Sequence, residues 1–247
     1  MHTLLRFAAA SGLVGLTLMA PVAHAATFAG PQTATGSYLA GQQAITELRT
    51  HEAAEFFHDA TTEDWNNPLI LDRAFIAFAA DGQVDAAAET AKRAVELEPD
   101  NDLAKLVLAT EAFKQRRYDA AIADLDKLDP GTFEGVTGSI LKAWAIVGDN
   151  RIDDAFGSLD KIGDGGLEEF LVFHRAIMAD VAGRQDDAIK YITEAHDADP
   201  YTADVVEAYA RILADAGQYD KARDASTAFE GQGLASPIIT DVKAAIA

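Results

Sequence analysis

The chain has 247 residues, a formal net charge of −20 and no cysteine. Without cysteine it has no disulfide, thiolate metal site, cysteine nucleophile or lipidated N-terminal cysteine. Its acidic charge repels phosphate groups, so nucleic acids and lipid headgroups are poor partners, whereas basic proteins and cations are compatible with it. We interpret the charge first as a source of solubility, with attraction of a basic partner as the alternative.

Residues 1–25 have the pattern of a secretory signal peptide. Arg6 supplies a positive start, and an uncharged apolar stretch of 14 residues covers 7–20. The sequence AHA at 23–25 places small residues where signal peptidase cleaves, so we expect cleavage after Ala25. A membrane anchor is the alternative, but 14 residues are short for a bilayer span. The sequence therefore predicts an exported, soluble protein of a bacterial periplasm.

Residues 26–36, ATFAGPQTATG, are small and polar and lack periodicity, which indicates a flexible arm ahead of the first helix. The remaining residues, 37–247, contain no other linker, so we expect one domain. Hydrophobic residues make up 49% of the chain, and many of them are alanine, which favours closely packed helices over sheets.

Alanine recurs along this domain at a nearly fixed interval. The recurring positions are Ala53, Ala87, Ala121, Ala155, Ala188 and Ala222, separated by 34, 34, 34, 33 and 34 residues. The residues twelve positions before these alanines are, in order, Gly41, Phe75, Ala109, Ala143, Ala176 and Ala210. All of them except Phe75 are small. A period of this length accommodates two helices of about 12–14 residues and two turns. We interpret the small residues as the points where neighbouring helices cross closely.

With this period the chain resembles the tetratricopeptide repeat family. The second repeat matches the family pattern most closely, through Leu71, Phe78, Ala87, Ala94 and Pro99. The resemblance covers roughly residues 34–247. It implies an all-α fold, a right-handed α-solenoid of about six helix-turn-helix repeats followed by a final single helix.

Three repeats depart from the family pattern at the place where a proline is usual. The first has Trp65 there, the third has its proline early, at Pro130, and the fourth has GDGG at 163–166 instead. The GDGG segment lacks the alternating acidic residues of a calcium loop, and we interpret it as a turn between repeats.

Residues 236–247, SPIITDVKAAIA, begin a seventh repeat. Ser236 and Pro237 predict the start of a helix. Its apolar side chains are Ile238, Ile239, Val242 and Ile246. Two interpretations stay open: the helix covers repeat six as a lid, or the chain is a shortened relative of longer exported repeat proteins or pairs with another chain there.

The sequence offers little sign of catalysis. It contains no Gly-rich phosphate loop, no GxSxG and no HExxH, so we expect no enzyme, catalytic residue or cofactor. His51, Glu55 and His58 have the i, i+4, i+7 spacing of one helix face, which suits Zn²⁺ or Ni²⁺. Because a fourth ligand is not evident, we expect no metal site and interpret these residues as a solvated face.

The resemblance implies a concave groove lined by positions 2, 5, 9 and 12 of the first helix in each repeat. These positions give Leu69, Ile76, Leu103, Leu106, Phe113, Ile140, Trp144, Val147, Phe170, Phe173 and Ile177. The predicted lining turns polar in the sixth repeat, with Asp204, Glu207 and Arg211. Trp144 is the expected anchor for a partner. The alternatives are that these residues form ordinary core or that the N-terminal arm covers them.

These observations lead to one main functional hypothesis. The protein is expected to be a non-enzymatic exported scaffold or adaptor that binds a protein or peptide, such as an amphipathic or hydrophobic segment, in the apolar groove. Cell-envelope assembly or secretion is the expected setting, by analogy with exported repeat proteins. The rivals are self-association through the apolar C-terminal helix and metal binding at His51, Glu55 and His58.

Overall fold

A computed structural model describes residues 33–162 and 166–246. The predicted signal peptide, most of the predicted arm and residues 163–165 of the GDGG segment lie outside these ranges. The described residues form thirteen α-helices and no strand. The helices are α1 (Ala34–Thr46), α2 (Thr50–Glu63), α3 (Pro68–Ala80), α4 (Val84–Leu97), α5 (Asp102–Lys114), α6 (Tyr118–Leu125), α7 (Phe133–Gly148), α8 (Ile152–Leu159), α9 (Glu168–Val181), α10 (Gln185–Ala198), α11 (Ala203–Asp215), α12 (Tyr219–Gly231) and α13 (Pro237–Ile246).

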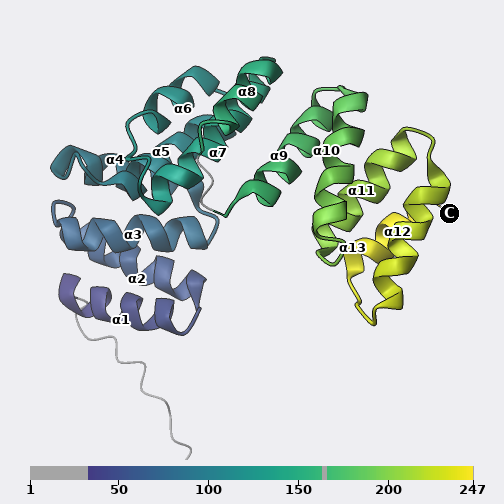
Figure 1. The fold of residues 1–247 in the computed structure, drawn as a ribbon. Coiled ribbons are helices and arrows are strands. Elements are labelled where there is room, and N and C mark those ends of the chain that lie inside the picture. The colour runs from purple at the N-terminus through teal and green to yellow at the C-terminus, as the bar shows by residue number, and fades with distance from the viewer. Residues whose placement is uncertain (1–32, 163–165, 247) are drawn as a thin grey trace, which may run out of the picture. The chain divides into compact units, whose positions relative to one another are not determined.

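Each helix packs against the next one along the chain, and the odd-numbered helices also contact one another in most neighbouring repeats (Figure 1). Helices α1 to α12 therefore form six pairs, and α13 follows as a single helix. This arrangement confirms the predicted all-α fold of six helix-turn-helix repeats and a last helix. Among the described helices, none combines the length and the apolar character needed to cross a bilayer.

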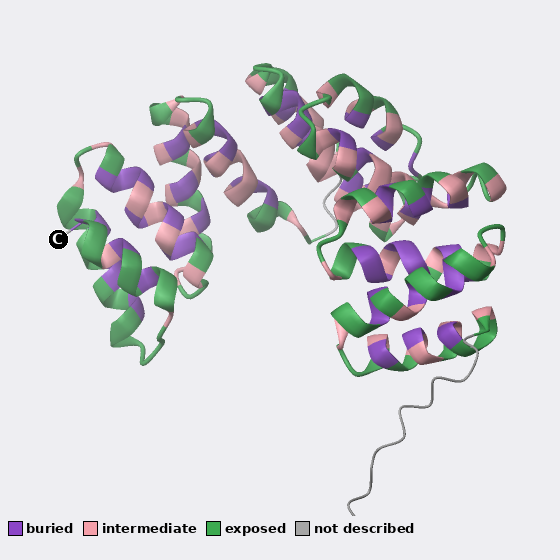
Figure 2. Ribbon diagram, turned by 180° about the vertical axis from the view of Figure 1, so that it is seen from behind, coloured by how far each residue is buried: buried purple, intermediate pink, exposed green. Residues whose placement is uncertain are grey.

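The recurring small residues are the buried contact points between the paired helices. The six alanines of the even-numbered helices are at most 1% exposed, and buried segments alternate with exposed ones along the helices (Figure 2). Gly41 shows why a small residue is needed, because a Cβ atom there would lie 2.6 Å from Cε2 of Phe57. A closely packed interior has no room for such an atom. The interpretation of the small residues as crossing points is confirmed.

The turn inside each repeat has its own period, which the sequence reading did not detect. A residue with positive φ closes every odd-numbered helix of the six pairs, at Leu48, Gly82, Arg116, Asn150, Gly183 and Gly217. In the first turn, Arg49 N–H donates to the carbonyl of Ala44 at 2.9 Å, which satisfies a carbonyl at the end of α1. Glycine adopts this conformation without strain, whereas Leu48 and Arg116 adopt it at a steric cost.

Helices α6 and α8 differ from the prediction, since each has eight residues instead of about 12–14. Both belong to repeats that lack the proline at its usual place. In repeat three the early Pro130 is followed by α7, which starts at Phe133 and gains a first turn. A Cβ atom at Gly135 would overlap the carbonyl oxygen of Asp129, so this turn requires glycine. In repeat three the period is kept because the added turn of α7 and a longer connection, residues 126–132, make up for the short α6.

The two ends of the described chain refine the predicted boundaries. Helix α1 begins at Ala34, within the predicted arm of residues 26–36, because the Thr33 side chain accepts a hydrogen bond from the Gly36 N–H at 3.1 Å. At the other end, α13 packs against α11 and α12. Three of its apolar side chains are buried there, namely Ile239, Val242 and Ile246. Helix α13 therefore covers repeat six, as the lid interpretation expects.

Candidate binding grooves

The first candidate site is an apolar hollow of about 630 Å³ between α5, α7 and α9, which we call the central groove. No charged residue lines it. Its lining residues are Leu106, Thr110, Phe133, Val136, Thr137, Ile140, Leu141, Trp144, Leu167 and Phe170. Two of its aromatic side chains are exposed to solvent: Phe133 is 80% exposed and Phe170 is 47% exposed. Clustered exposed apolar side chains of this kind mark interaction surfaces.

Trp144 and His174 form a polar contact beside the central groove. The indole Nε1–H of Trp144 on α7 donates to Nδ1 of His174 on α9 at 3.0 Å. The rings of Phe170 and Phe173 also contact His174 edge to face, with centroid separations of 4.4 and 6.1 Å. Burial among these rings lowers the pKa of His174 below its usual value, because it disfavours the charged imidazolium. A neutral ring leaves Nδ1 free to accept the hydrogen bond from the indole N–H, and this bond fixes the orientation of Trp144.

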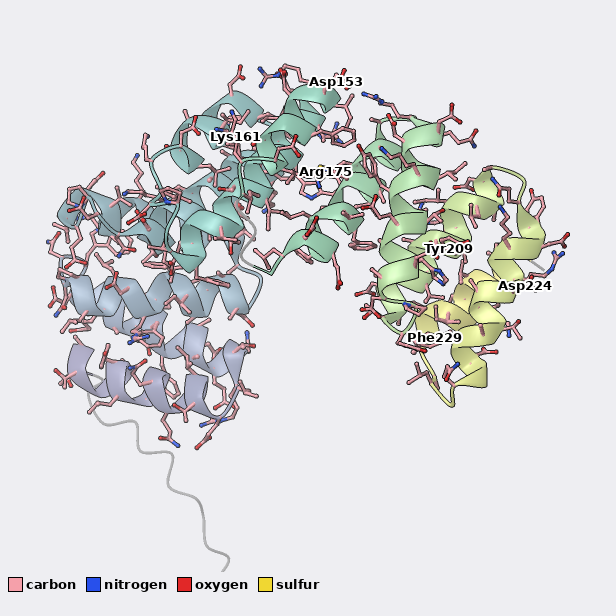
Figure 3. All side chains as sticks on the ribbon, in the orientation of Figure 1. Asp153, Lys161, Arg175, Tyr209, Asp224 and Phe229 are labelled. Carbon is pink, nitrogen blue, oxygen red and sulfur yellow. The ribbon has the colours of Figure 1, made fainter. Side chains whose placement is uncertain are left out.

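This contact crosses the junction where consecutive helices touch least, between α8 and α9. Ion pairs support the same junction: Arg175 of α9 pairs with Asp160, and Arg184 before α10 pairs with Asp153 of α8 (Arg175 and Asp153 are labelled in Figure 3). Arg184 also lies over the Phe156 ring, 5.7 Å from its centroid. The central groove is therefore bounded on one side by α9, which specific side-chain contacts attach to repeat four.

A second hollow, of about 560 Å³, adjoins the central groove and shares Trp144 with it. Its lining includes Phe113, Tyr118 and Val147. The lining also includes the polar side chains of Asn150 and Arg184, so Trp144 borders an apolar hollow on one side and a mixed one on the other.

The other candidate site lies between α11 and α13 and has a volume of about 720 Å³; we call it the end groove. Its apolar floor is formed by Ala214, Ile238, Val242, Ala245 and Ile246, with Tyr219 at its border. Its charged lining consists of Asp204, Glu207, Arg211, Asp215 and Asp241, that is, four carboxylates and one guanidinium.

The single cation of the end groove is already paired. Arg211 Nη1 lies 2.6 Å from an oxygen of Asp180 on α9, and its Nε lies 3.3 Å from an oxygen of Glu207. Asp204 and Asp241 have no ion-pair partner within the described part of the chain. The end groove therefore combines apolar area with uncompensated negative charge.

Comparison with known proteins bears on the fold. No family model matches the sequence, and no curated protein matches it. Among solved structures, a tetratricopeptide repeat protein from Parabacteroides merdae has a TM-score of 0.66 at 16% identity and covers 87% of this chain and 84% of its own. The chain has the tetratricopeptide-repeat fold. PilW, described as a widely conserved type IV pilus biogenesis factor, also has a TM-score of 0.66 at 16% identity, with coverage of 85% and 97%.

A further similar structure is PilF of Pseudomonas aeruginosa, with a TM-score of 0.57 at 13% identity and coverage of 85% of this chain and 96% of its own. All three comparisons are below the identity at which function is transferred with the fold. They establish the tetratricopeptide-repeat architecture, and with it the equivalence of positions from repeat to repeat.

The repeat numbering accounts for part of the lining of both grooves. The end groove is lined by positions 2, 5, 9 and 12 of repeat six and by positions 2, 5 and 9 of the partial repeat seven. Of the eleven residues predicted to line a groove, the structure brings Leu106, Ile140, Trp144 and Phe170 together in the central groove. Phe113 and Val147 line the adjoining hollow.

The other predicted groove residues lie elsewhere. Leu69 is 70% exposed. Ile76 and Leu103 pack against the buried cluster that contains Leu71 and Phe75. Phe173 and Ile177 pack against a cluster of α9, α10 and α11, so both serve partly as core.

Sequence reasoning missed Phe133 and Leu167 because both precede the first helical position of their repeats. The early proline at Pro130 was the available signal for Phe133, since a proline placed early lets α7 begin one turn sooner. Leu167 directly follows the GDGG segment and offered no comparable signal.

His51, Glu55 and His58 do not converge in the structure. His51 Nδ1 lies 3.1 Å from Asp81 Oδ2 at the end of α3, and His51 Nε2 lies 3.8 Å from Glu55 Oε1. The hydrogen bond to Asp81 raises the pKa of His51 above its usual value. In residues 33–162 and 166–246, no group of three histidine or acidic side chains is arranged to hold a metal ion. His51 thus acts here as one partner in a contact between repeats.

Proposed function

We propose that the protein is a non-enzymatic, exported scaffold that binds a partner polypeptide in the central groove. One observation carries this proposal: exposed aromatic rings and an uncharged lining occur together in a single hollow. Removing apolar surface from water stabilises a complex by roughly 25 cal/mol per Å², so such a hollow favours an apolar occupant. An amphipathic helix or an extended hydrophobic segment supplies that surface.

The composition of the central groove favours binding over catalysis. Its lining contains no ionisable side chain, and its only hydroxyls are those of Thr110 and Thr137. A general base or a metal ligand is needed to activate a hydroxyl, and the lining provides neither. We therefore assign the groove to recognition.

Trp144 is the proposed anchor of the partner. Its hydrogen bond to His174 holds the indole in one orientation before a partner arrives. A pre-oriented side chain loses little rotamer freedom on binding, so the entropic cost of forming the complex is smaller. Phe133 and Phe170 flank the hollow and supply the apolar area around this anchor.

The proposed setting is the bacterial cell envelope. Two observations support it: residues 1–25 carry the pattern of a cleaved signal peptide, and the fold is shared with PilW, described as a type IV pilus biogenesis factor. The proposed task is assembly or secretion of envelope components.

The experiment is quantitative capture of partners from an envelope extract. The test variant is Phe133→Ser with Phe170→Ser, which removes exposed apolar area and leaves the core intact. The matched control is Leu39→Ser with Tyr201→Ser, because these side chains are 61% and 59% exposed and do not line the central groove. Equal helicity of all three proteins is established first.

A partner that wild type and the control retain, and that the test variant loses by about tenfold or more, supports the proposal. Capture of the same proteins in equal amounts by all three rules out recognition through the central groove.

A further inference from the structure

The end groove differs from the central groove in its charge. Four carboxylates line it, and the single guanidinium is held by Asp180 and Glu207. Lys243, the one cation of α13, pairs with Glu230 of α12 outside the lining of the groove. A ligand in this groove therefore meets an uncompensated negative potential.

Apolar area accompanies this charge. Ile238 is 37% exposed and Tyr219 is 51% exposed, and both border the groove. The Val242, Ala245 and Ile246 side chains continue the floor along α13. An occupant must therefore bury apolar side chains and present positive charge at the same time.

A second copy of this chain does not satisfy these conditions. In a symmetric pair the same surface faces itself, so Asp204 and Asp241 of one copy would meet those of the other. Like charges brought together across an interface cost free energy. The chain as a whole carries 40 acidic and 20 basic side chains, which disfavours most other surfaces too.

The N-terminal segment of the chain is also a poor match. Residues 1–32 contain Arg6 as their only lysine or arginine. One basic side chain cannot compensate the carboxylates of the end groove.

We infer that the end groove binds a basic amphipathic segment of a partner protein, with apolar side chains on α13 and lysine or arginine facing Asp204, Glu207 and Asp241. Phosphate-bearing ligands are excluded by the same potential. This site is separate from the central groove, and the inference holds whether or not the proposed function does.

The probe is a labelled synthetic helix of roughly 18 leucine and lysine residues, about five turns long, with leucine on one face and lysine on the other. Two control peptides accompany it, one with glutamate in place of lysine and one of scrambled order that lacks an apolar face. Affinity is measured by fluorescence anisotropy at about 50 mM and about 300 mM salt.

The test variant is Asp204→Asn with Asp241→Asn. The matched control is Asp119→Asn with Asp59→Asn, which removes the same charge from exposed sites outside the groove. Asp119 lies in the first turn of α6 as Asp204 does in α11, and Asp59 lies in a later turn of its helix as Asp241 does. A third variant, Ile238→Ser, removes apolar area without changing charge.

We expect saturable binding of the leucine–lysine helix that weakens about tenfold in the Asp204/Asp241 variant and less than about twofold in the control. The Ile238→Ser variant weakens binding too, and neither control peptide shows binding that depends on Asp204, Asp241 or Ile238. Higher salt reduces the difference between the Asp204/Asp241 variant and wild type. The Phe133→Ser, Phe170→Ser variant binds this probe as wild type does, which separates the result from the central groove.

Four outcomes overturn the inference. They are absence of saturable binding, equal weakening in both charge variants, loss of binding only in the Phe133/Phe170 variant, and a dimer that forms through α13 and that the probe does not dissociate. The last outcome would assign the end groove to a second copy of the chain.

Discussion

The two grooves occupy equivalent repeat positions and have opposite chemistry. At positions 2, 5 and 9, repeat four presents Thr137, Ile140 and Trp144, whereas repeat six presents Asp204, Glu207 and Arg211. The buried residues beneath them are alike, since Ala143 and Ala210 are both fully buried. Within one fold, the buried small residues therefore set the helix packing that forms each groove. A few side chains on the surface of the groove determine what binds there.

The largest expected effect comes from enlarging the shared buried positions. Ala143→Leu and Ala210→Leu force a larger side chain into a closely packed crossing, and each lowers the free energy of unfolding by roughly 1–3 kcal/mol or more. Ala123→Leu, at an exposed site on α6, changes it by less than about 0.5 kcal/mol. Urea unfolding followed by helicity measures all three. If both buried substitutions change the free energy of unfolding as little as the exposed one, the helices beneath the two grooves are not closely packed at these alanines.

The next effect should be specific to each groove, and it is seen when each variant is titrated with each ligand. Phe133→Ser with Phe170→Ser is expected to weaken the binding of a central-groove partner about tenfold. The affinity of the end groove for the leucine–lysine helix is expected to stay unchanged. Asp204→Asn with Asp241→Asn is expected to do the reverse. Titrations of each ligand against each variant at two salt concentrations test this, and salt should affect only the end groove strongly. One variant that weakens both ligands equally would show that the sites are not distinct.

A smaller effect concerns the Trp144–His174 contact, which has no counterpart among the described contacts of the end groove. Because burial lowers the pKa of folded His174, the unfolded chain binds more protons between that pKa and about 6.5. Stability from this group is present above about pH 6.5 and is lost as pH falls through the folded pKa. The free energy of unfolding of wild type relative to His174→Gln should thus decline below pH 6.5. A difference that is flat between pH 8 and pH 5 would contradict a buried neutral imidazole.

The smallest effect has the opposite sign and lies outside both grooves. Asp81 raises the pKa of exposed His51, so the folded chain binds more protons than the unfolded chain above about pH 6.5. This contribution is present below about pH 6.5 and is lost as pH rises through the folded pKa. NMR titration of both imidazoles is expected to give a midpoint above 6.5 for His51 and below 6.5 for His174. An Asp81→Asn variant should return His51 toward its usual value, and an unchanged midpoint would exclude Asp81 as the cause.

The repeat period predicted the helix pairs and the buried residues because both follow from local spacing. Alanine at a fixed interval is visible in the sequence, and the structure buries all six of these residues. The lengths of α6 and α8 were not predicted, since both helices end early, in repeats that lack the usual proline. The average repeat pattern does not specify where an individual helix ends.

The candidate sites were predicted less completely than the fold. The groove positions 2, 5, 9 and 12 placed Trp144 and Phe170 together, as the structure does, whereas Leu69, which they also selected, is 70% exposed and lines neither the central groove nor the adjoining hollow. His174 lies 30 residues after Trp144, at a position that this set does not include. Such a contact depends on the angle between α7 and α9, which no pattern of apolar residues specifies.

The most direct test of the central claim uses Trp144 as its own reporter. The sequence has two tryptophans, so Trp65→Phe leaves Trp144 as the only one. The captured partner is added to this variant while the indole emission is recorded. Recognition in the central groove predicts a saturable spectral shift that disappears when Phe133→Ser and Phe170→Ser are added. Binding of the partner with unchanged Trp144 emission would contradict recognition in the central groove.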